Sequence, residues 1–395
     1  MNPVPDARAA RSLYAVIIEG LLGRLGFGVV TFALPFYALS LGMSYTEVGI
    51  LAALRLVAAI ALKPWMGRVA DRYGIRNVYI ASIVGRCVVT VLFAVTTAPW
   101  ALFGIRFLHG VTTAARDPVS AVLIADYSPN AKLARAYAWY GSAREFGAAI
   151  GFLVAGLLLA ATDDFYPAAF LFAGAVSVVA VVAVMVMLPR AESIAGHVTA
   201  GQDGAAGQKD HTNWQELALV GLLLAASGSM ITQLFPVLAV EHAQLSKAEA
   251  GMLYAIATGV SVVAGPLLGW VADTVSHSLV LTLRGGANVV ATLLYWLWPT
   301  FFGFLAGRVL DETGKAAFRA AWGRVLAGAA HSGDRKKRTQ RVAHLDTAQS
   351  IGEAAGPVLA GWLWDTVGVM GLFSARIVLG IIAEIVSARW VQRRY

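Results

Sequence analysis

KPWMGRVADRYG, residues 63–74, has a counterpart later in the chain in AGPLLGWVADTVS, residues 264–276. Further matches follow in the same order, at an offset that drifts only from about 201 to 205 residues. The matched pairs are Pro35 with Pro236, Glu47 with Glu249, Gly49 with Gly251, Pro64 with Pro266, Gly67 with Gly269, Asp71 with Asp273, Arg106 with Arg308, Gly147 with Gly352, Gly151 with Gly356 and Gly156 with Gly361. Ordered matches at a near-constant offset indicate a duplicated unit.

The composition indicates that lipid surrounds most of the chain. Of its 395 residues, 58% are hydrophobic and 14% are charged, whereas soluble globular proteins carry about 25% charged residues. This argues against a soluble enzyme, a disordered chain and a nucleic-acid-binding domain, although the formal net charge is +8. Cys87 is the single cysteine, which excludes an internal disulfide and a cysteine-rich metal site.

Twelve stretches are long and apolar enough to cross a bilayer, which takes roughly 20 residues of helix. Strands of a membrane barrel are shorter and alternate in polarity, so the sequence predicts an all-α integral membrane protein with twelve transmembrane helices. The predicted spans are residues 13–39, 46–68, 77–97, 99–124, 133–160, 165–188, 214–238, 249–271, 278–298, 300–328, 342–364 and 369–390.

One hydrophilic stretch divides these spans into two sets. Residues 189–213 are rich in glycine, alanine and polar residues, which predicts a flexible linker. It separates two pseudo-symmetric six-helix bundles, residues 1–188 and 214–395. Basic residues gather in one set of loops, and the opposite set contains only Lys247. By the positive-inside rule we expect the linker and both termini to be cytoplasmic, in a multi-pass protein of a bacterial-type inner (plasma) membrane.

The loop between the second and third spans carries a known signature. GRVADRYGIRN, residues 67–77, resembles the pattern G-x-x-x-D-R-x-G-x-[RK] of the major facilitator superfamily (MFS). The matching positions are Gly67, Asp71, Arg72, Gly74 and Arg76. The resemblance implies the MFS fold, two bundles that open a central cavity alternately to each side, and a cytoplasmic gate at this loop. The gate's acidic partner is expected to be Asp126 or Asp117.

Two more patterns are similar to those of the superfamily. The fourth span matches R-x-x-x-G through Arg106 and Gly110. A glycine-rich pattern, G-x-x-x-G-P-x-x-x-G, is associated with antiporters when it lies in the fifth span. Here the complete pattern lies in the eleventh span, and the fifth has Phe152 in place of the proline. We expect these residues to form a helix-packing motif: Gly147, Gly151, Gly352, Gly356 and Pro357.

Ionisable side chains inside the predicted spans are costly, so each is a candidate for the substrate or proton pathway. Glu19 and Arg24 interrupt the first span, and Arg55 lies in an apolar run of the second. The resemblance implies that an acidic residue in the first span couples protons in drug exporters. Arg106 and His109 lie on one face of the fourth span, and the resemblance implicates Arg106 in proton transfer or cavity charge.

The tenth span is the most polar. Its charges fall near one helical stripe, which cannot face lipid and must either line a wet cavity or form a structural ion-pair network. The stripe contains Arg308, Asp311, Glu312 and Lys315. Candidate partners on facing helices are Arg144 and Glu145 in the fifth span, and Asp346 and Glu353 in the eleventh.

The sequence contains no G-x-x-x-x-G-K-[ST] loop, no catalytic triad and no metal-ligand spacing. We therefore predict a protein that is not an enzyme, needs no cofactor or metal, and is driven by a gradient. The favoured hypothesis is an efflux-type secondary transporter that exports a small organic solute by proton antiport, as a monomer in the lipid bilayer and without nucleic acid. Alternatives are a proton-linked importer or uniporter of an organic anion, suggested by the intramembrane arginines, and a non-transporting membrane sensor.

Overall fold

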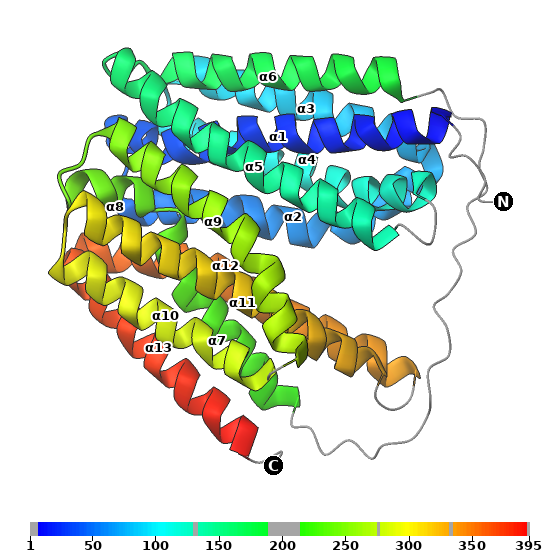
Figure 1. Ribbon diagram of the computed structural model, residues 1–395. Helices are drawn as coiled ribbons and strands as arrows, with labels where there is room; N and C mark the ends of the chain where they lie inside the picture. The colour runs from blue at the N-terminus through cyan, green and yellow to red at the C-terminus, as the bar shows by residue number, and fades with distance from the viewer. Residues whose placement is uncertain (1–6, 129–132, 189–213, 275–276, 332–334, 393–395) are drawn as a thin grey trace. The chain divides into compact units, whose positions relative to one another are not determined.

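The computed structural model describes residues 7–128, 133–188, 214–274, 277–331 and 335–392. The predicted linker, residues 189–213, lies outside the described residues. The described part of the chain is helical and contains thirteen helices (Figure 1). They are α1 (Ala7–Ser40), α2 (Tyr45–Tyr73), α3 (Ile75–Val95), α4 (Pro99–Tyr127), α5 (Leu133–Ala161), α6 (Tyr166–Met187), α7 (Trp214–Thr232), α8 (Phe235–Glu241), α9 (Lys247–Thr274), α10 (His277–Leu297), α11 (Phe301–His331), α12 (Arg335–Val367) and α13 (Val369–Gln392).

The all-helical prediction is confirmed, with one difference in the count of helices. The predicted span 214–238 is divided between α7, which ends at Thr232, and α8, which begins at Phe235. Pro236 lies in the first turn of α8, where its missing N–H costs no helical hydrogen bond. Each other predicted span coincides with one helix. By length and composition, seven of the described helices satisfy strict criteria for a membrane span.

The described residues form two compact units. Unit 1 takes its members from residues 1–43, 54–198 and 246–258. Unit 2 takes its members from residues 44–53, 199–245 and 259–395. The first turns of α2 therefore pack within unit 2, and the first turns of α9 pack within unit 1.

In unit 1, α1 packs along α5 and α6, and α3 packs along α4 and α6. Glycine permits the close contact between α1 and α5. A Cβ at Gly147 would lie under 3.0 Å from the carbonyl oxygen of Leu21, and a Cβ at Gly151 would lie equally close to that of Leu25. Small residues let helix backbones approach in this way inside a membrane.

Unit 2 repeats the arrangement, with α7 along α12 and α10 along α11 and α13. Here Gly352 and Gly356 of α12 face the backbone of α7 at Leu222 and Ala226, too closely for any Cβ. The carbonyl group of Pro357 meets Gly49, in the first turns of α2. Gly147 and Gly151 thus serve the same packing role in unit 1 as their matches Gly352 and Gly356 serve in unit 2.

The matched glutamates of the repeat also have one role, which is to begin a helix. The Ser44 N–H donates to Glu47 Oε2 at 2.7 Å, and the Glu47 N–H donates to Ser44 Oγ at 3.2 Å. In unit 1 the same reciprocal pair joins Ser246 and Glu249, at 2.8 and 3.2 Å. Each pair is a capping box, which satisfies two backbone donors at a helix N-terminus.

Each of these helix starts is also held by an aspartate from another helix or its loop. In unit 2, Asp365 of α12 accepts hydrogen bonds from the backbone N–H groups of Tyr45 and Thr46, at 3.1 and 2.8 Å. In unit 1, Lys247 Nζ lies 2.6 Å from Asp164, in the loop that follows α5. An aspartate therefore contacts the start of each helix, at α2 through backbone N–H groups and at α9 through the side chain of Lys247.

Two substitutions in α5 test the close packing of α1. Gly147→Ala places a Cβ against the α1 backbone, so we expect the free energy of unfolding to fall by about 1–3 kcal/mol and the Tm of the purified protein to drop. Gly141→Ala is the matched control, because a Cβ there has nothing within 4 Å. Equal Tm values for the two variants in detergent would contradict this account of the α1–α5 contact.

Candidate functional site

Glu19 is the centre of a buried ion cluster in unit 1. Its two carboxylate oxygens accept hydrogen bonds from Arg116 Nε and Nη2, at 2.8 and 2.5 Å. The hydroxyl of Tyr79 donates to the same carboxylate at 2.7 Å, and Arg86 Nη1 lies 3.8 Å away. The Glu19 and Arg116 side chains are 0% and 1% exposed. Three hydrogen bonds, two of them from one guanidinium group, therefore fix the position of this carboxylate inside unit 1.

A second cationic cluster surrounds Phe27, one turn further along α1. The guanidinium carbons of Arg24 and Arg55 lie 4.9 and 5.0 Å from the centre of the Phe27 ring. The ring of His109 makes an edge contact with Phe27 at 5.8 Å. His109 in turn lies beside Arg106, with Nδ1 3.4 Å from Nη1. Arg24 and Arg55 are half-buried, whereas Arg106 and His109 are buried.

Gly110 explains how two of these arginines come together. A Cβ at Gly110 would lie 2.6 Å from the carbonyl oxygen of Arg55 and 2.6 Å from the Cβ of Ala58. Only glycine therefore lets α2 lie this close to α4. Since Gly110 follows Arg106 by four residues, the R-x-x-x-G pattern positions Arg55 beside Arg106, and the two guanidinium groups repel each other electrostatically.

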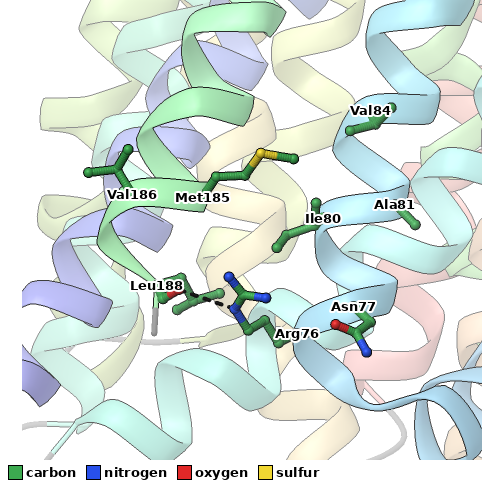
Figure 2. Close-up of a pocket in the computed structure, with 8 residues that line it drawn as sticks. All are labelled: Arg76, Asn77, Ile80, Ala81, Val84, Met185, Val186 and Leu188. Carbon is green, nitrogen blue, oxygen red and sulfur yellow. Dashed lines mark hydrogen bonds between the residues drawn. The ribbon is translucent and has the colours of Figure 1, made fainter. Parts of the chain in front are cut away.

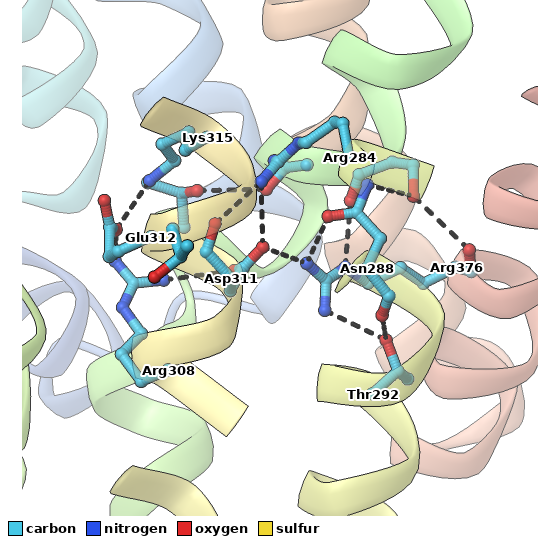
Figure 3. A network of polar contacts seen from close by, with 12 residues as sticks. Arg284, Asn288, Thr292, Arg308, Asp311, Glu312, Lys315 and Arg376 are labelled. Atoms are coloured by element: carbon cyan, nitrogen blue, oxygen red, sulfur yellow. Dashed lines mark hydrogen bonds and ion pairs between the residues drawn. The ribbon is translucent and has the colours of Figure 1, made fainter. Parts of the chain in front are cut away.

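Unit 2 contains a larger polar network, centred on Asp311 of α11 (Figure 3). Three arginines from three helices reach its carboxylate. Arg376 of α13 lies 2.8 Å from Oδ1, Arg284 of α10 lies 3.2 Å from Oδ1, and Arg308 lies 3.5 Å from Oδ2. Asp311, Arg308 and Arg376 are all 0% exposed. This one carboxylate therefore ties α10, α11 and α13 together.

Arg376 also satisfies the neutral polar groups of the network. It donates from Nε to the carbonyl oxygen of Ser227, from Nη1 to Thr292 Oγ1 and from Nη2 to Asn288 Oδ1, at 3.0, 2.9 and 3.2 Å. Asn288 donates from its amide to Ser227 Oγ at 3.2 Å. A buried network is stable when its donors and acceptors are met in this way.

Glu312 extends the network along α11. Its Oε1 lies 2.7 Å from Arg308 Nη2 and 2.7 Å from Lys315 Nζ. The guanidinium of Arg308 lies over the ring of Phe235, 4.6 Å from its centre. The polar stripe that the sequence predicts in the tenth span is therefore paired within unit 2, both along α11 itself and, through Asp311, with Arg284 of α10 and Arg376 of α13.

The partners proposed from sequence for this stripe have contacts or surroundings of their own. Asp346 is exposed on α12, and Glu353 accepts a hydrogen bond at 2.9 Å from Gln349 of its own helix. In unit 1, the guanidinium of Arg144 lies 5.4 Å from the centre of the Tyr140 ring. Glu145, beside it on α5, is half-buried and attracts Arg24 electrostatically.

Four residues of these networks were not predicted from the sequence. Each is a polar or charged residue within an apolar span, which is the signal that marks the predicted site residues as well. They are Arg86, Arg284, Asn288 and Arg376. Their partners lie far away in the sequence, so pairing could not be read from spacing.

The signature loop between α2 and α3 is a tight turn. Gly74 has φ +87°, a left-handed conformation that favours glycine. Arg76 donates from Nε to the carbonyl oxygen of Leu188 at 3.1 Å. Arg76 and Leu188 also line a cavity of about 630 Å³ between α3 and the end of α6, together with apolar side chains such as Ile80 and Met185 (Figure 2).

The other members of the loop motif are solvent-accessible. Asp71 and Arg72 are exposed, and the guanidinium of Arg72 lies 5.5 Å from the centre of the Tyr73 ring. Asp126 is exposed near the end of α4. Within the described residues, the ion pairs do not include one between Asp126 and Arg72 or Arg76. A Cβ at Gly67 would meet nothing within 4 Å, so its surroundings are open.

A family model described as Major Facilitator Superfamily matches residues 18–301 and 217–395. The chain belongs to the Major Facilitator Superfamily. The helical architecture, the duplicated units and the signature loop are all those of this family, and the expected fold is confirmed.

Several characterised relatives of this MFS chain are named for drug resistance. Tetracycline resistance protein, class B, from Escherichia coli is 29% identical over 143 residues, which are 35% of each chain. Puromycin resistance protein pur8 from Streptomyces alboniger is 34% identical over 155 residues, 39% of this chain and 31% of its own. Quinolone resistance protein NorA from Staphylococcus aureus is 25% identical over 188 residues, 47% of this chain and 48% of its own. Each match thus spans less than half of the relative's length.

Solved MFS structures match nearly the whole chain at low identity. A bacterial homologue of the human lysosomal transporter Spinster, in an inward-facing and occupied conformation, has a TM-score of 0.74 at 15% identity, covering 98% of this chain and 97% of its own. The nucleoside transporter NupG has a TM-score of 0.69 at 13% identity, covering 96% and 98%. At such identities the likeness establishes the fold alone. The protein is a multi-pass membrane protein of a transporter family.

Asp311→Asn tests the network of unit 2. The substitution leaves three buried arginines without their shared charge, and breaking a buried pair in this way costs about 3–5 kcal/mol. We expect a large drop in Tm and a loss of folded, monodisperse protein. Asp346→Asn makes the same chemical change at an exposed position of α12 and is the control. Similar Tm values for the two variants would show that Asp311 does not hold the unit together.

Proposed function

We propose that this MFS protein is a secondary active transporter that exports a small organic solute in exchange for protons. The observation that carries the proposal is the pair of buried carboxylate–arginine networks, one in each unit, in a family of transporters. Ionisable groups at such cost inside a membrane are retained for pathways of substrates or ions. The drug-resistance names of the relatives support the outward direction.

Proton coupling would act through the carboxylates of these networks. Glu19, Asp311 and Glu312 each neutralise one or more arginines, so a proton bound to any of them would release a guanidinium group. An arginine released in this way would change the affinity of the protein for its solute. It would also change the packing of the helices around that arginine. The charge state of the network thereby links proton binding to conformation.

The moving parts would be the predicted bundles, residues 1–188 and 214–395, joined by residues 189–213. We place both termini and this linker in the cytoplasm, from the distribution of basic residues, and treat the functional unit as a monomer. The loop of Gly67, Asp71, Arg72, Gly74 and Arg76 would then close the cytoplasmic side. On the opposite side of the membrane, the polar contacts of Asp365 and Asp164 at the starts of α2 and α9 would stabilise the closed state.

Flux measurements in proteoliposomes test this proposal. The reconstituted protein is loaded with radiolabelled candidate solutes, including tetracycline, puromycin and a quinolone, and an inward proton gradient is imposed. We expect the gradient to accelerate export, and an uncoupler to abolish the acceleration. Flux that ignores the gradient for every transported solute would overturn proton antiport, and flux only in the import direction would favour the importer of an organic anion.

Glu19→Gln separates proton binding from transport itself. Glutamine keeps the size and polarity of the side chain but cannot take up a proton, so gradient-driven export should fall to the level of uncoupled exchange. Because the substitution also removes the charge that pairs with Arg116, the Tm of the variant is measured first, and solute exchange without a gradient should continue in the folded protein. Asp163→Asn removes an exposed carboxylate outside the spans and should retain the gradient response. A full gradient response in the Glu19 variant would remove this residue from the proton pathway.

A further inference from the structure

The side chain of Lys247, at the start of α9, ends among two aromatic rings and a carboxylate of unit 1. Its ammonium nitrogen Nζ lies 4.8 Å from the centre of the Phe36 ring and 5.2 Å from the centre of the Tyr166 ring. It also donates to the hydroxyl oxygen of Tyr166 at 3.1 Å and lies 2.6 Å from Asp164 Oδ1. Two ring faces, a hydroxyl and a carboxylate around one nitrogen are the contacts by which proteins bind an ammonium ion.

We call Phe36, Asp164 and Tyr166 the ammonium cage, and each of them is held by unit 1. The ring of Tyr166 packs against that of Tyr37, with the centres 5.5 Å apart, and Phe36 and Tyr37 are buried on α1. Asp164 lies in the connection between α5 and α6, where its backbone N–H and carbonyl groups are hydrogen-bonded to the end of α5 and the start of α6. The cage is therefore built from α1, α6 and the α5–α6 connection, and Lys247 fills it from α9.

The sequence repeat identifies the residue of unit 2 that corresponds to Lys247. Lys247 and Tyr45 each follow the serine of one of the two matched capping boxes. Glycines also place the two residues alike. A Cβ at Gly156 would lie under 3.0 Å from the carbonyl oxygen of Lys247, and a Cβ at its match Gly361 would lie equally close to that of Tyr45.

Unit 2 fills the matched position with an aromatic stack and no cation. The ring of Tyr45 lies 4.4 Å from that of Trp364, nearly parallel at 13°, and the Tyr45 hydroxyl donates to Glu241. Val237 stands at the position matched to Phe36, because each follows one of the matched prolines. Both arrangements hold the start of a helix, so the scaffold does not require an ammonium ion here. The ammonium cage is specific to unit 1.

Lys247 reaches the cage from a helix that is divided between the units. Residues 246–258 pack within unit 1, and α9 from residue 259 onward packs within unit 2. A movement of α9 would withdraw the ammonium group and leave the two rings and the carboxylate of the cage in place. The Asp164 side chain is 49% exposed, so a cation from solvent can reach the cage along this side.

The loops that the proposed topology places outside also attract cations. Lys247 is the single lysine or arginine in these loops, whereas Asp163, Asp164 and Glu241 are among their carboxylates. A surface with this imbalance of charge raises the local concentration of cations. An organic ammonium ion would therefore be enriched next to the cage.

We infer that the ammonium cage is an external binding site for the ammonium group of an organic amine, which Lys247 occupies in this conformation. The inference rests on the proposed transport function for its two states, one with the start of α9 at the cage and one with it withdrawn. It adds the chemical class of a ligand, which is a primary ammonium ion on a short apolar chain, like the lysine side chain itself. An amine in the cage competes with Lys247 and thereby stabilises the withdrawn state.

Chemical rescue of a Lys247 variant in detergent tests the inference. Lys247→Ala removes the ammonium group and most of the alkyl chain, so we expect the Tm to fall. n-Propylammonium chloride supplies the missing atoms and should restore about half of the lost Tm at a concentration well above its Kd. Neutral n-propanol, sodium propionate and sodium chloride at equal ionic strength should restore nothing.

The wild-type protein is measured beside the variant. Its Tm should not respond to n-propylammonium, because Lys247 already fills the cage. Two results would overturn the inference: no rise in the Tm of Lys247→Ala with n-propylammonium, or an equal rise in the wild type. If Lys247→Ala does not fold when prepared alone, the yield of monodisperse protein prepared with n-propylammonium, relative to n-propanol, gives the same comparison.

Further variants locate the bound amine. Lys247→Met fills the cage with an uncharged chain, so n-propylammonium should have no effect on its Tm. Asp164→Asn, added to Lys247→Ala, removes the charge of the cage and should abolish the rescue. Asp163→Asn in the same background removes the neighbouring exposed carboxylate and should leave the rescue intact. Rescue that survives Asp164→Asn would place the amine elsewhere and overturn the assignment.

These measurements separate the inference from the proposed function. If n-propylammonium rescues Lys247→Ala but solute flux in proteoliposomes ignores a proton gradient, proton antiport fails and the ammonium cage stands. If gradient-driven export is observed and no amine restores the variant, the transport function stands and the ammonium cage fails.

Discussion

The structure of this protein depends on the cost of burying charge in a medium of low dielectric constant. Asp311 shows the constraint most clearly, since its single carboxylate is met by arginines from α10, α11 and α13. None of these groups could be buried alone. The network therefore joins α10, α11 and α13, in addition to the apolar side chains and glycine contacts that pack the helices.

The two units solve this problem differently although their sequences are repeats. In unit 2 the charges of α11 are balanced largely within the network, by Asp311 and Glu312. In unit 1 the carboxylate of Glu19 balances Arg116, while the arginines around Phe27 are positioned by an aromatic ring and by the close approach of α2 at Gly110. The two units thus share their packing glycines and capping boxes but differ in the positions of their charged residues.

Much of the fold was predictable from the sequence because its signals are local. Apolar length predicts the spans, the repeat predicts two related units, and the signature motif predicts the loop between α2 and α3. The candidate site was predictable only in part. The sequence predicts site residues where a charge lies within an apolar span, as for Glu19, Arg106, Asp311 and Glu312. The same pattern holds at Arg86, Arg284 and Arg376, which were not predicted.

By itself, the sequence determined that this chain is helical, duplicated and a membrane protein of the Major Facilitator Superfamily, because hydrophobic length, ordered repeats and a loop signature are properties of contiguous residues. Only the tertiary structure decided which charge meets which. Arg376 reaches Asp311 across 65 residues, and Arg116 reaches Glu19 across 97. Such pairs depend on how helices pack in three dimensions, and no spacing along the chain encodes them.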